Sequence, residues 1–291
     1  MKLIVKLWGG LGNQLFQYAT AFSLSKKINK PLFCDLTHPS LSIHPFMLDK
    51  FKISSKFLYK DDILNENIKN YNSISLILYK KFGLNFIDKS FYIERNFKYQ
   101  KNFEKINEEK ILIGHFLSEK YFINNRNEIL NEFLIKNELN IENKKSLNLI
   151  KNYNSISIHI RRGDFLSKNN VNNYYICPLD YYKSALKLLV DKNDKNKEIG
   201  LFIFSDDLNW AEENLKFNYP TYFISHNRND SSYEDLRLMS HCNHNIIANS
   251  SFSWWAAWLN SNENKIVISP KHWHKKYEFT DIIPNSWITL S

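Results

Sequence analysis

Apolar runs alternate regularly with amphipathic stretches after residue 154, and this rhythm constrains the fold more than any other feature of the sequence. The apolar runs are short enough for strands, and each stretch between them repeats apolar positions at helical spacing. Strands that alternate with helices in this way predict a doubly wound parallel sheet. The expected strands are Ser155–Ile160, Ile199–Phe204, Thr221–Ile224, Asn245–Ala248 and Lys265–Ile268, and the expected helices are Leu179–Val190, Leu208–Lys216, Tyr233–His241 and Phe252–Asn260.

The N-terminal residues predict a second α/β unit. Leu3–Leu7 is an apolar run, Gly9–Gly12 interrupts it, and a helix capped by Asn13 is expected to continue to about Ile28 before a strand at Leu32–Leu36. This order is a βαβ unit, which implies a parallel sheet.

Residues 37–110 carry many aromatics without a sustained period, so no elements are predicted there. Beyond them, Ile111–Phe116 predicts a strand, and Arg126–Lys136 and Lys144–Tyr153 predict helices. We expect two Rossmann-like domains, residues 1–150 and 151–291, that face each other across a cleft and bind ligands at the carboxyl ends of their strands.

Composition excludes several classes of protein. The 291 residues hold 39 Lys+Arg and 30 Asp+Glu, a net charge of +9, and nowhere form an apolar stretch long enough to span a membrane. Three cysteines without a C-x-x-C pair predict buried thiols rather than disulfides or a zinc site. The basic excess suits nucleic acid, a membrane surface or a phosphorylated substrate, but the basic residues are scattered, so nucleic-acid binding is not expected.

The first candidate site is the glycine-rich turn at Gly9–Gln14. Gly10 and Gly12 let a ligand approach the backbone, and the new helix offers free N–H groups to an anion. As a dinucleotide motif the turn is weak, because Leu15 stands where a third glycine is required. Asp35, at the end of the next strand, keeps an NAD-dependent dehydrogenase as an alternative. A bare turn would not explain the amides of Asn13 and Gln14.

The second candidate site follows the apolar strand Ser155–Ile160. Alternation places His159 and Arg161 on one side of the chain, and guanidinium groups at the end of a buried strand need anionic partners. We interpret Arg161 as a phosphate ligand. For Arg162, a phosphate and an internal ion pair with Asp164 remain equal alternatives. His159 is either a catalytic base or a neutral residue hydrogen-bonded in the sheet.

The third candidate site is the hydroxyl-rich start of the helix after Ala248. Ser250, Ser251 and Ser253 are more hydroxyls than a helix cap requires, so the excess indicates a second phosphate contact. The tryptophans that follow are expected to pack in the core: Trp254, Trp255 and Trp258.

Two aspartates and several histidines complete the candidates. Asp206 should lie at the end of its strand, and Asp235 is either a surface charge or a purine-binding carboxylate. No Asp-x-Asp motif occurs, and no cysteine or carboxylate completes a zinc site with the histidine pairs His241/His244 and His272/His274. We therefore expect no metal, because paired arginines neutralise phosphate without one.

Four strings of this sequence resemble the motifs of bacterial α1,2-fucosyltransferases of glycosyltransferase family 11: GGLGNQLFQYA at 9–19, HIRRGDF at 159–165, FSDD at 204–207 and DLRLMSHCNHNIIANSSFSWWAAWL at 235–259. The resemblance implies a GT-B-like fold, GDP-fucose as donor, a terminal galactose as acceptor, inversion at the anomeric carbon and no cofactor. Residues 1–150 then form the acceptor-side domain and 151–291 the GDP-fucose-binding domain.

The resemblance also assigns roles. It places Arg161 and Arg162 at the diphosphate, with Ser251, Phe252 and Ser253 as further contacts. Asp235 would bind the guanine edge, Asp206 lies at the nucleotide, and Asn13 and Gln14 face the donor sugar and the acceptor. For the base that deprotonates the acceptor, Asp164 leads, with His159 and Asp35 as alternatives.

The remaining expectations concern acceptor and location. A different acceptor, linkage or GDP-sugar is the main alternative, ahead of a basic nucleic-acid-binding protein. The +9 charge and a lipid-linked acceptor favour a cytoplasmic protein in peripheral contact with the inner face of the membrane. The sequence leaves the natural glycan and the oligomeric state open.

Overall fold

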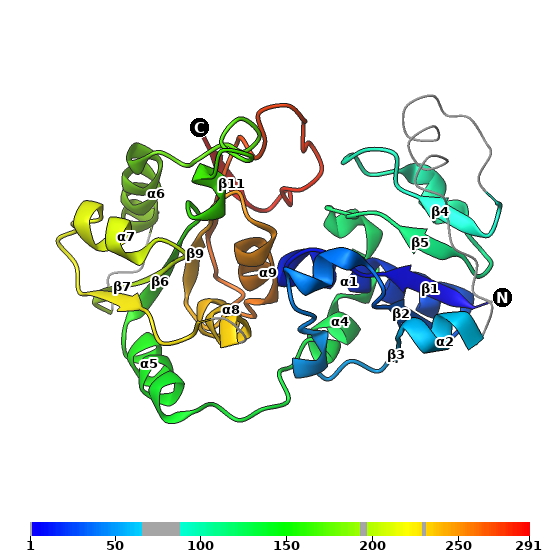
Figure 1. The fold of residues 1–291 in the computed structure, drawn as a ribbon. Helices are drawn as coiled ribbons and strands as arrows, with labels where there is room; N and C mark the ends of the chain where they lie inside the picture. The colour runs from blue at the N-terminus through cyan, green and yellow to red at the C-terminus, as the bar shows by residue number, and fades with distance from the viewer. Residues whose placement is uncertain (1, 66–87, 193–196, 229–230) are drawn as a thin grey trace. The chain divides into compact units, whose positions relative to one another are not determined.

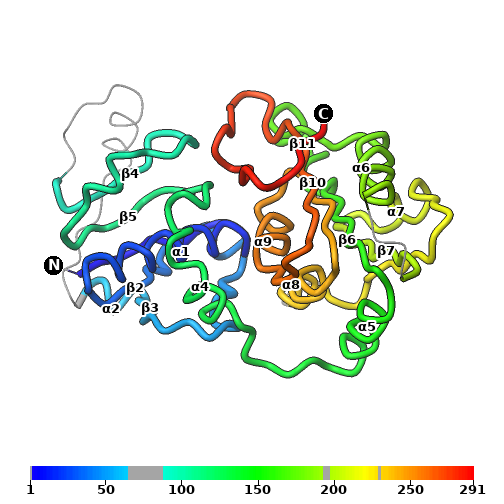
Figure 2. Tube along the Cα trace, turned by 180° about the vertical axis from the view of Figure 1, so that it is seen from behind, coloured from blue at the N-terminus to red at the C-terminus, as the bar shows by residue number. Residues whose placement is uncertain are grey.

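The computed structural model describes residues 2–65, 88–192, 197–228 and 231–291, which fall into two compact units. The first comprises residues 1–136 with 280–282, and the second 137–279 with 283–291 (Figures 1 and 2). The boundary after Lys136 lies earlier than the expected position between residues 150 and 151. The reason is that helix α5 (Ile141–Asn152) leads directly into the first strand of the second unit and packs on it and on a later helix of that unit.

The first unit contains a parallel sheet in the order β3-β2-β1-β5-β4. Its elements are β1 Leu3–Lys6, α1 Leu11–Ile28, β2 Leu32–Asp35, β3 Lys56–Leu58, α2 Lys60–Asn65, β4 Phe91–Ile93, β5 Ile111–Ile113 and α4 Arg126–Glu132. The predicted βαβ start is confirmed. Elements β3, α2 and β4 fall in the stretch without a prediction, part of which (66–87) lies outside the described residues.

The second unit contains a parallel sheet in the order β11-β10-β9-β6-β7-β8. Besides α5 its elements are β6 Asn154–Ile160, α6 Leu179–Lys192, β7 Ile199–Ser205, α7 Leu208–Asn214, β8 Thr221–Ile224, α8 Ser232–Ser240, β9 His244–Ile246, α9 Ser251–Leu259, β10 Val267–Pro270 and β11 Ile288–Leu290. The predicted alternation is confirmed, and β11 is the strand that the sequence pattern missed.

The core of the second unit explains its apolar runs. Every residue of the central strand β6 is buried, as are the strand residues Leu201 and Ile203 and the inner face of α6, including Ala185 and Leu189. This burial accounts for the mainly apolar runs of this half of the sequence, although β6 itself alternates serine with isoleucine while it is buried on both faces. Trp254, Trp255 and Trp258 are buried in the core, as expected, and so are all three cysteines as free thiols.

Candidate active site

Three neighbouring strands of the second sheet bring the motifs of this unit to one edge. Strand β6 lies between β9 and β7, and all three run parallel. Arg161 follows β6, Asp206 follows β7, and Ser250 lies between β9 and α9. The carboxyl edge of a parallel sheet is where such folds bind ligands.

Arg161 is half-buried between two carboxylates. Its Nη2 lies 2.7 Å from Asp164 Oδ1 and its Nη1 lies 3.0 Å from Asp206 Oδ2. The guanidinium also lies over the ring of Phe165, 5.4 Å from its centroid, and this ring stacks on Tyr174. The position of Arg161 is therefore set by ion pairs and by packing.

Arg162 points to a different partner. Its Nε lies 3.3 Å from Asp207 Oδ2, its guanidinium lies 3.9 Å from the centroid of the Trp210 ring, and its backbone N–H donates to Asp206 Oδ1 at 2.8 Å. Asp207 also caps α7 by accepting the Trp210 N–H. The expected ion pair between Arg162 and Asp164 is therefore not formed: Asp164 pairs with Arg161, and Arg162 pairs with Asp207.

The carboxylates of this cluster outnumber its guanidinium groups. Two guanidiniums face three carboxylates, a formal charge of 2 − 3 = −1. A phosphate bound by Arg161 would add to this negative charge unless it displaced a carboxylate. Asp164 is the more exposed partner, at 48% against 23% for Asp206, and is the easier one to release.

Asp206 holds this arrangement together with little room to move. A Cβ at Gly163 would lie only 3.0 Å from Asp206 Oδ2, so the loop after β6 and the carboxylate pack tightly. Asp206 thus orients Arg161. This role keeps Asp206 at the expected nucleotide site, but through its ion pair with the arginine.

His159 is buried two residues before Arg161, and its Nδ1 has no hydrogen-bond partner among the residues that the structure describes. Burial lowers its pKa to about 4, with a further lowering by Arg161 that Asp206 opposes, so the ring is neutral at pH 7. The ring lies 5.7 Å from that of Phe252. A buried ring nitrogen without a partner suits ligand binding, whereas the low pKa disfavours His159 as the base.

The hydroxyl run divides into two roles. Ser250 is the N-cap of α9 and accepts the Phe252 N–H, and Ser253 is buried with its hydroxyl on the Ser250 carbonyl. Ser251, half-exposed in the first turn of α9, is the serine of this run best placed to meet a ligand. The N-terminus of α9 adds a positive dipole end at the same edge.

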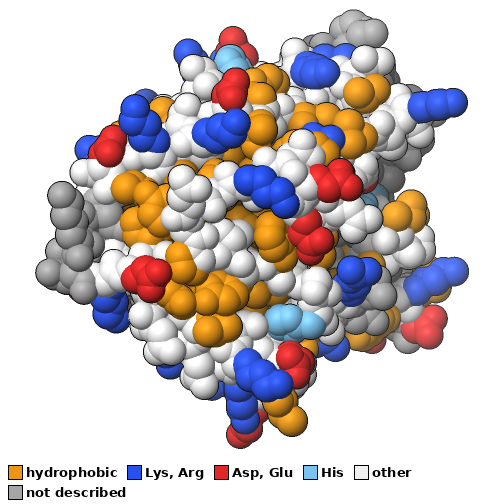
Figure 3. All heavy atoms as spheres, turned by 90° about the vertical axis from the view of Figure 1, so that its left-hand side faces the viewer, with side chains coloured by type: hydrophobic (Ala, Val, Ile, Leu, Met, Phe, Trp, Pro, Cys, Tyr) orange, Lys and Arg blue, Asp and Glu red, His pale blue; other side chains and the backbone are white. Residues whose placement is uncertain are grey.

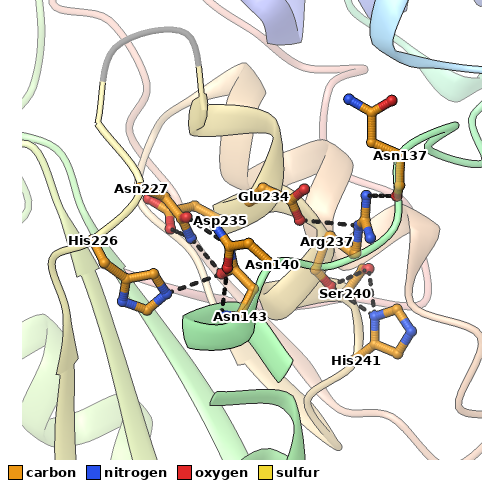
Figure 4. Close-up of polar contacts among 10 residues, drawn as sticks. All are labelled: Asn137, Asn140, Asn143, His226, Asn227, Glu234, Asp235, Arg237, Ser240 and His241. Atoms are coloured by element: carbon orange, nitrogen blue, oxygen red, sulfur yellow. Dashed lines mark hydrogen bonds and ion pairs between the residues drawn. The ribbon is translucent and has the colours of Figure 1, made fainter. Parts of the chain in front are cut away.

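Asp235 lies in a second polar cluster, which Figure 4 shows. Asn227 Nδ2 donates to Asp235 Oδ1 at 2.9 Å, and Asn227 and Asn143 of α5 exchange amide hydrogen bonds at 2.8 Å. His226 Nε2 lies 3.0 Å from Asn143 Oδ1. Burial raises the pKa of Asp235 to about 7, and the Asn227 hydrogen bond opposes this shift. No sequence pattern indicates the Asn143–Asn227 pair, because the two residues lie on segments that are far apart in the chain.

The glycine turn of the first unit departs from two expectations. Gly10, not Asn13, is the N-cap of α1, and Asn13 lies inside the first turn. Gln14 is fully buried and spends its amide on the protein: its Nε2 donates to the carbonyls of Gly9 and Pro45, and its Oε1 accepts the Met47 N–H. Gln14 therefore stabilises the turn. Its amide is not available to a donor sugar, because it is buried and hydrogen-bonded to the backbone of Gly9, Pro45 and Met47.

Asp35 is also committed to the protein. It is buried, with Oδ2 3.0 Å from Lys6 Nζ and Oδ1 accepting both the backbone N–H and the hydroxyl of Thr37. A carboxylate occupied in this way is a poor base and a poor ribose ligand. This removes the support for Asp35 in either of its alternative roles.

Three further expectations concern a metal ion, a membrane-spanning helix and nucleic acid. Among residues 2–65, 88–192, 197–228 and 231–291, no three or more His, Cys, Asp or Glu side chains are grouped to hold a metal ion. No helix in this described part of the chain is both long and apolar enough to cross a membrane. On the face in Figure 3, lysines and arginines are interspersed with acidic and hydrophobic side chains, which is unlike a nucleic-acid-binding stripe.

Comparison with known proteins decides the family. The family model described as Glycosyl transferase family 11 matches residues 2–291. The chain belongs to glycosyl transferase family 11. Within this family it is 32% identical to the O-antigen biosynthesis glycosyltransferase WbnK of Escherichia coli, over 98% of this chain and 99% of that protein.

Two further relatives carry names that specify a linkage. The chain is 32% identical to the alpha-1,2-colitosyltransferase of Escherichia coli, over 99% of this chain and 98% of that protein. It is 27% identical to galactoside alpha-(1,2)-fucosyltransferase 1 of Plecturocebus brunneus over 36% of this chain and 28% of that protein.

A solved structure supports the fold of this family 11 chain. The structure of NodZ alpha-1,6-fucosyltransferase soaked with GDP-fucose matches 89% of this chain and 93% of its own, with a TM-score of 0.53 and 15% identity. The expected GT-B-like α/β fold is confirmed, with one parallel sheet in each unit.

Proposed function

We propose that this glycosyltransferase is an inverting, metal-independent galactoside α1,2-fucosyltransferase that takes L-fucose from GDP-fucose. The observation that carries the proposal is Arg161 at the carboxyl end of β6, whose neighbouring strands lead to Asp206 and to α9. Two residues before Arg161 lies His159, whose buried Nδ1 has no hydrogen-bond partner among the described residues. The α1,2 linkage in the names of two relatives and the GDP-fucose soaked into a solved neighbour support it.

Charge development assigns the work of Arg161. As the fucose–phosphate bond breaks, negative charge grows on the GDP leaving group and positive charge on the sugar. A guanidinium already fixed by Asp206 and Phe165 stabilises the phosphate without reorganising, and loss of one such group typically lowers the rate about a hundredfold to a thousandfold. The N-terminus of α9 supplies further N–H groups to the diphosphate.

Asp164 is the base that this geometry favours. When phosphate replaces it on Arg161, the carboxylate is free to turn away from the diphosphate, toward the face of the sugar that the acceptor approaches. It then accepts the proton of the acceptor 2-hydroxyl while that oxygen attacks the anomeric carbon from the opposite face, which inverts its configuration. The remaining expected contacts stay predictions: Arg162, Ser251 and Phe252 at the diphosphate, Asp206 at the nucleotide site, Asp235 at guanine, Gly10 and Gly12 at the backbone approach, and Asn13 near the reacting sugars.

We further propose an acceptor in a surface glycan assembled on the cytoplasmic face of the membrane, on the basis of the O-antigen relative and the +9 charge. The second candidate is a colitosyltransferase. A relative with that name is 32% identical over almost the whole chain, and colitose is the 3-deoxy form of L-fucose. Both candidates use the same phosphate and guanine contacts.

The deciding experiment incubates purified protein with GDP-fucose and lactose in EDTA, beside Arg161→Ala. Mass spectrometry and linkage analysis should show fucose on the galactose 2-hydroxyl with wild type and a loss of about a hundredfold or more with the variant. Faster turnover of GDP-colitose in direct competition selects the second candidate. If the protein neither transfers fucose nor binds GDP, the proposal is wrong.

A further inference from the structure

Four aromatic side chains gather at the carboxyl edge of the first sheet, and the mechanism above uses none of them. Trp8 follows β1, His38 follows β2, Phe97 follows β4 and His115 follows β5. The Trp8 ring lies 5.5 Å from that of His38 and 5.4 Å from that of His115, which lies 5.6 Å from Phe97. We call these four side chains the ring cluster.

The ring cluster differs from the aromatic packing next to it. Its four members are all partly exposed, whereas Phe103, Phe116 and Tyr121, which pack on one another nearby in the chain, are buried. Core packing explains the buried set. Trp8 also packs in part on the apolar core of the first sheet, but core packing does not account for the exposed parts of four rings that meet at the carboxyl edge, where parallel sheets bind ligands.

Hydrogen bonds fix the backbone at Trp8 and join it to the ring of His38. The backbone N–H of Trp8 donates to Gln17 Oε1 at 3.0 Å, and the next backbone N–H, of Gly9, donates to Ser40 Oγ at 3.1 Å. Ser40 Oγ in turn lies 2.9 Å from His38 Nδ1, which joins the loop after β1 to the loop after β2. A surface fixed in this way loses little conformational entropy when a ligand binds.

His38 adds a polar group of defined character. Its Nδ1 accepts the Ser40 N–H at 3.1 Å, so the proton of the neutral ring resides on Nε2. Burial and the nearby charge of Lys6 lower the pKa of His38, which keeps the ring neutral at pH 7. The charge of Lys6 itself is balanced by Asp35. The ring cluster thus offers flat apolar faces and a neutral N–H donor, which suits an uncharged polyhydroxy ligand more than an anion.

We propose that the ring cluster binds the terminal galactose of the acceptor, with the sugar's apolar face on Trp8 and a hydroxyl accepting from His38 Nε2. Galactose fits this surface because its axial 4-hydroxyl leaves three ring C–H groups together on the opposite face. The inference rests on the proposed function for the identity of the sugar, but it concerns the first unit alone.

The test compares Trp8→Leu, which keeps an apolar side chain but no aromatic face, with Trp8→Phe, which keeps one. The KM for lactose should rise about fivefold in Trp8→Leu, because a ring contact of this kind contributes about 1 kcal/mol, and less than about twofold in Trp8→Phe. The KM for GDP-fucose should stay unchanged in both, as should GDP binding measured by calorimetry. Tyr59→Leu, an exposed aromatic of the same unit outside the ring cluster, serves as the control and should leave the lactose KM unchanged.

A second readout separates recognition from stability. Trp8→Leu should narrow the preference for lactose over cellobiose, whose terminal glucose lacks the patch that the C3, C4 and C5 hydrogens of galactose form on one face, and a folding defect would not change this ratio. If wild type binds GDP and transfers fucose while Trp8→Leu leaves both the lactose KM and this preference intact, the ring cluster is not the acceptor site and the proposed function stands.

If wild type neither binds GDP nor transfers fucose, the proposed function fails, and saturation-transfer NMR with lactose decides the inference alone. Galactose signals that disappear in Trp8→Leu support it. Their absence in wild type overturns it.

Discussion

Asp206 accepts from Arg161 and from the backbone of Arg162 at once, through its two different oxygens. Oδ2 lies 3.0 Å from Arg161 Nη1, and Oδ1 accepts the Arg162 N–H at 2.8 Å. The carboxylate of Asp206, directly after β7, therefore fixes both the side chain of Arg161 and the backbone of the loop that follows β6.

Replacing Asp206 should damage the reaction more than the fold. In Asp206→Asn the charge that orients Arg161 is lost, and a small misplacement of such a group lowers the rate about a hundredfold. We expect kcat for fucosyl transfer to fall by about this factor while the melting temperature changes little. Asp207→Asn is the matched control, because Asp207 pairs with Arg162 and caps α7 but does not touch Arg161. A larger effect from Asp207→Asn would contradict the assignment.

Gly10 and Gly9 offer a matched pair within one turn. A Cβ at Gly10 meets nothing within 4 Å, so Gly10→Ala should leave the unfolding free energy within about 1 kcal/mol of wild type, the usual effect of a change at an N-cap. Gly9 has φ +74°, and a Cβ there would lie 2.7 Å from Asn13 Nδ2, so Gly9→Ala should destabilise the fold.

If a ligand approaches the backbone at this turn, Gly10→Ala should instead raise the KM for donor or acceptor severalfold. Denaturant unfolding and steady-state kinetics on the same samples measure both effects. Unchanged kinetics in stable Gly10→Ala would remove this turn from the binding site.

The sequence predicted the second sheet well because its central strands β6 and β7 are rich in buried apolar residues and its helices are amphipathic. β6, β7 and β8 lie within one residue of their predicted bounds. β11 was missed because its partly exposed pattern in a short strand carries no such signal. Residues 37–110 gave no prediction for a related reason: β3 and β4 are three-residue strands whose identity depends on their neighbours in the sheet.

Site residues divide along similar lines. Motifs at strand ends were located correctly, because the end of a buried apolar run is visible in sequence. Partners were not: the commitment of Gln14 to the Gly9 and Pro45 carbonyls, and the link from Asn143 to Asn227, depend on tertiary contacts between distant segments. The ring cluster could not be predicted from sequence for the same reason, since its members follow four different strands.

His159 should make the stability of the protein depend on acid. Its pKa is about 4 in the folded protein and near 6.5 when unfolded, so the unfolded chain takes up the proton first as the pH falls. The stabilisation is complete above about pH 6.5 and is lost as the pH falls to about 4, up to about 3 kcal/mol. Denaturant unfolding in this range should show a shallower pH slope in His159→Gln than in wild type or in His241→Gln, which replaces an exposed histidine. Equal slopes in all three would show that His159 titrates normally.

The binding of GDP-fucose should depend on pH, because the carboxyl group of Asp235 titrates near neutral pH. Its pKa is about 7, and a carboxylate, not a carboxylic acid, accepts two N–H groups from guanine. The Kd of GDP-fucose should therefore fall as the pH rises from 6 to 8, and Asp235→Asn should bind more weakly without this dependence. GDP-fucose is the appropriate probe because its diphosphate, esterified at both ends, does not titrate in this range.

Two neighbouring substitutions should move the midpoint of this profile in opposite directions. The Asn227 hydrogen bond lowers the pKa of Asp235 and the charge of Glu234 raises it, so Asn227→Ala should shift the midpoint up and Glu234→Gln should shift it down (Figure 4). Calorimetric titration at several pH values measures all four proteins, with thermal melts to confirm folding. A wild-type Kd that is constant between pH 6 and 8 would show that Asp235 does not bind the base, and shifts in the same direction would show that the carboxylate is not the titrating group.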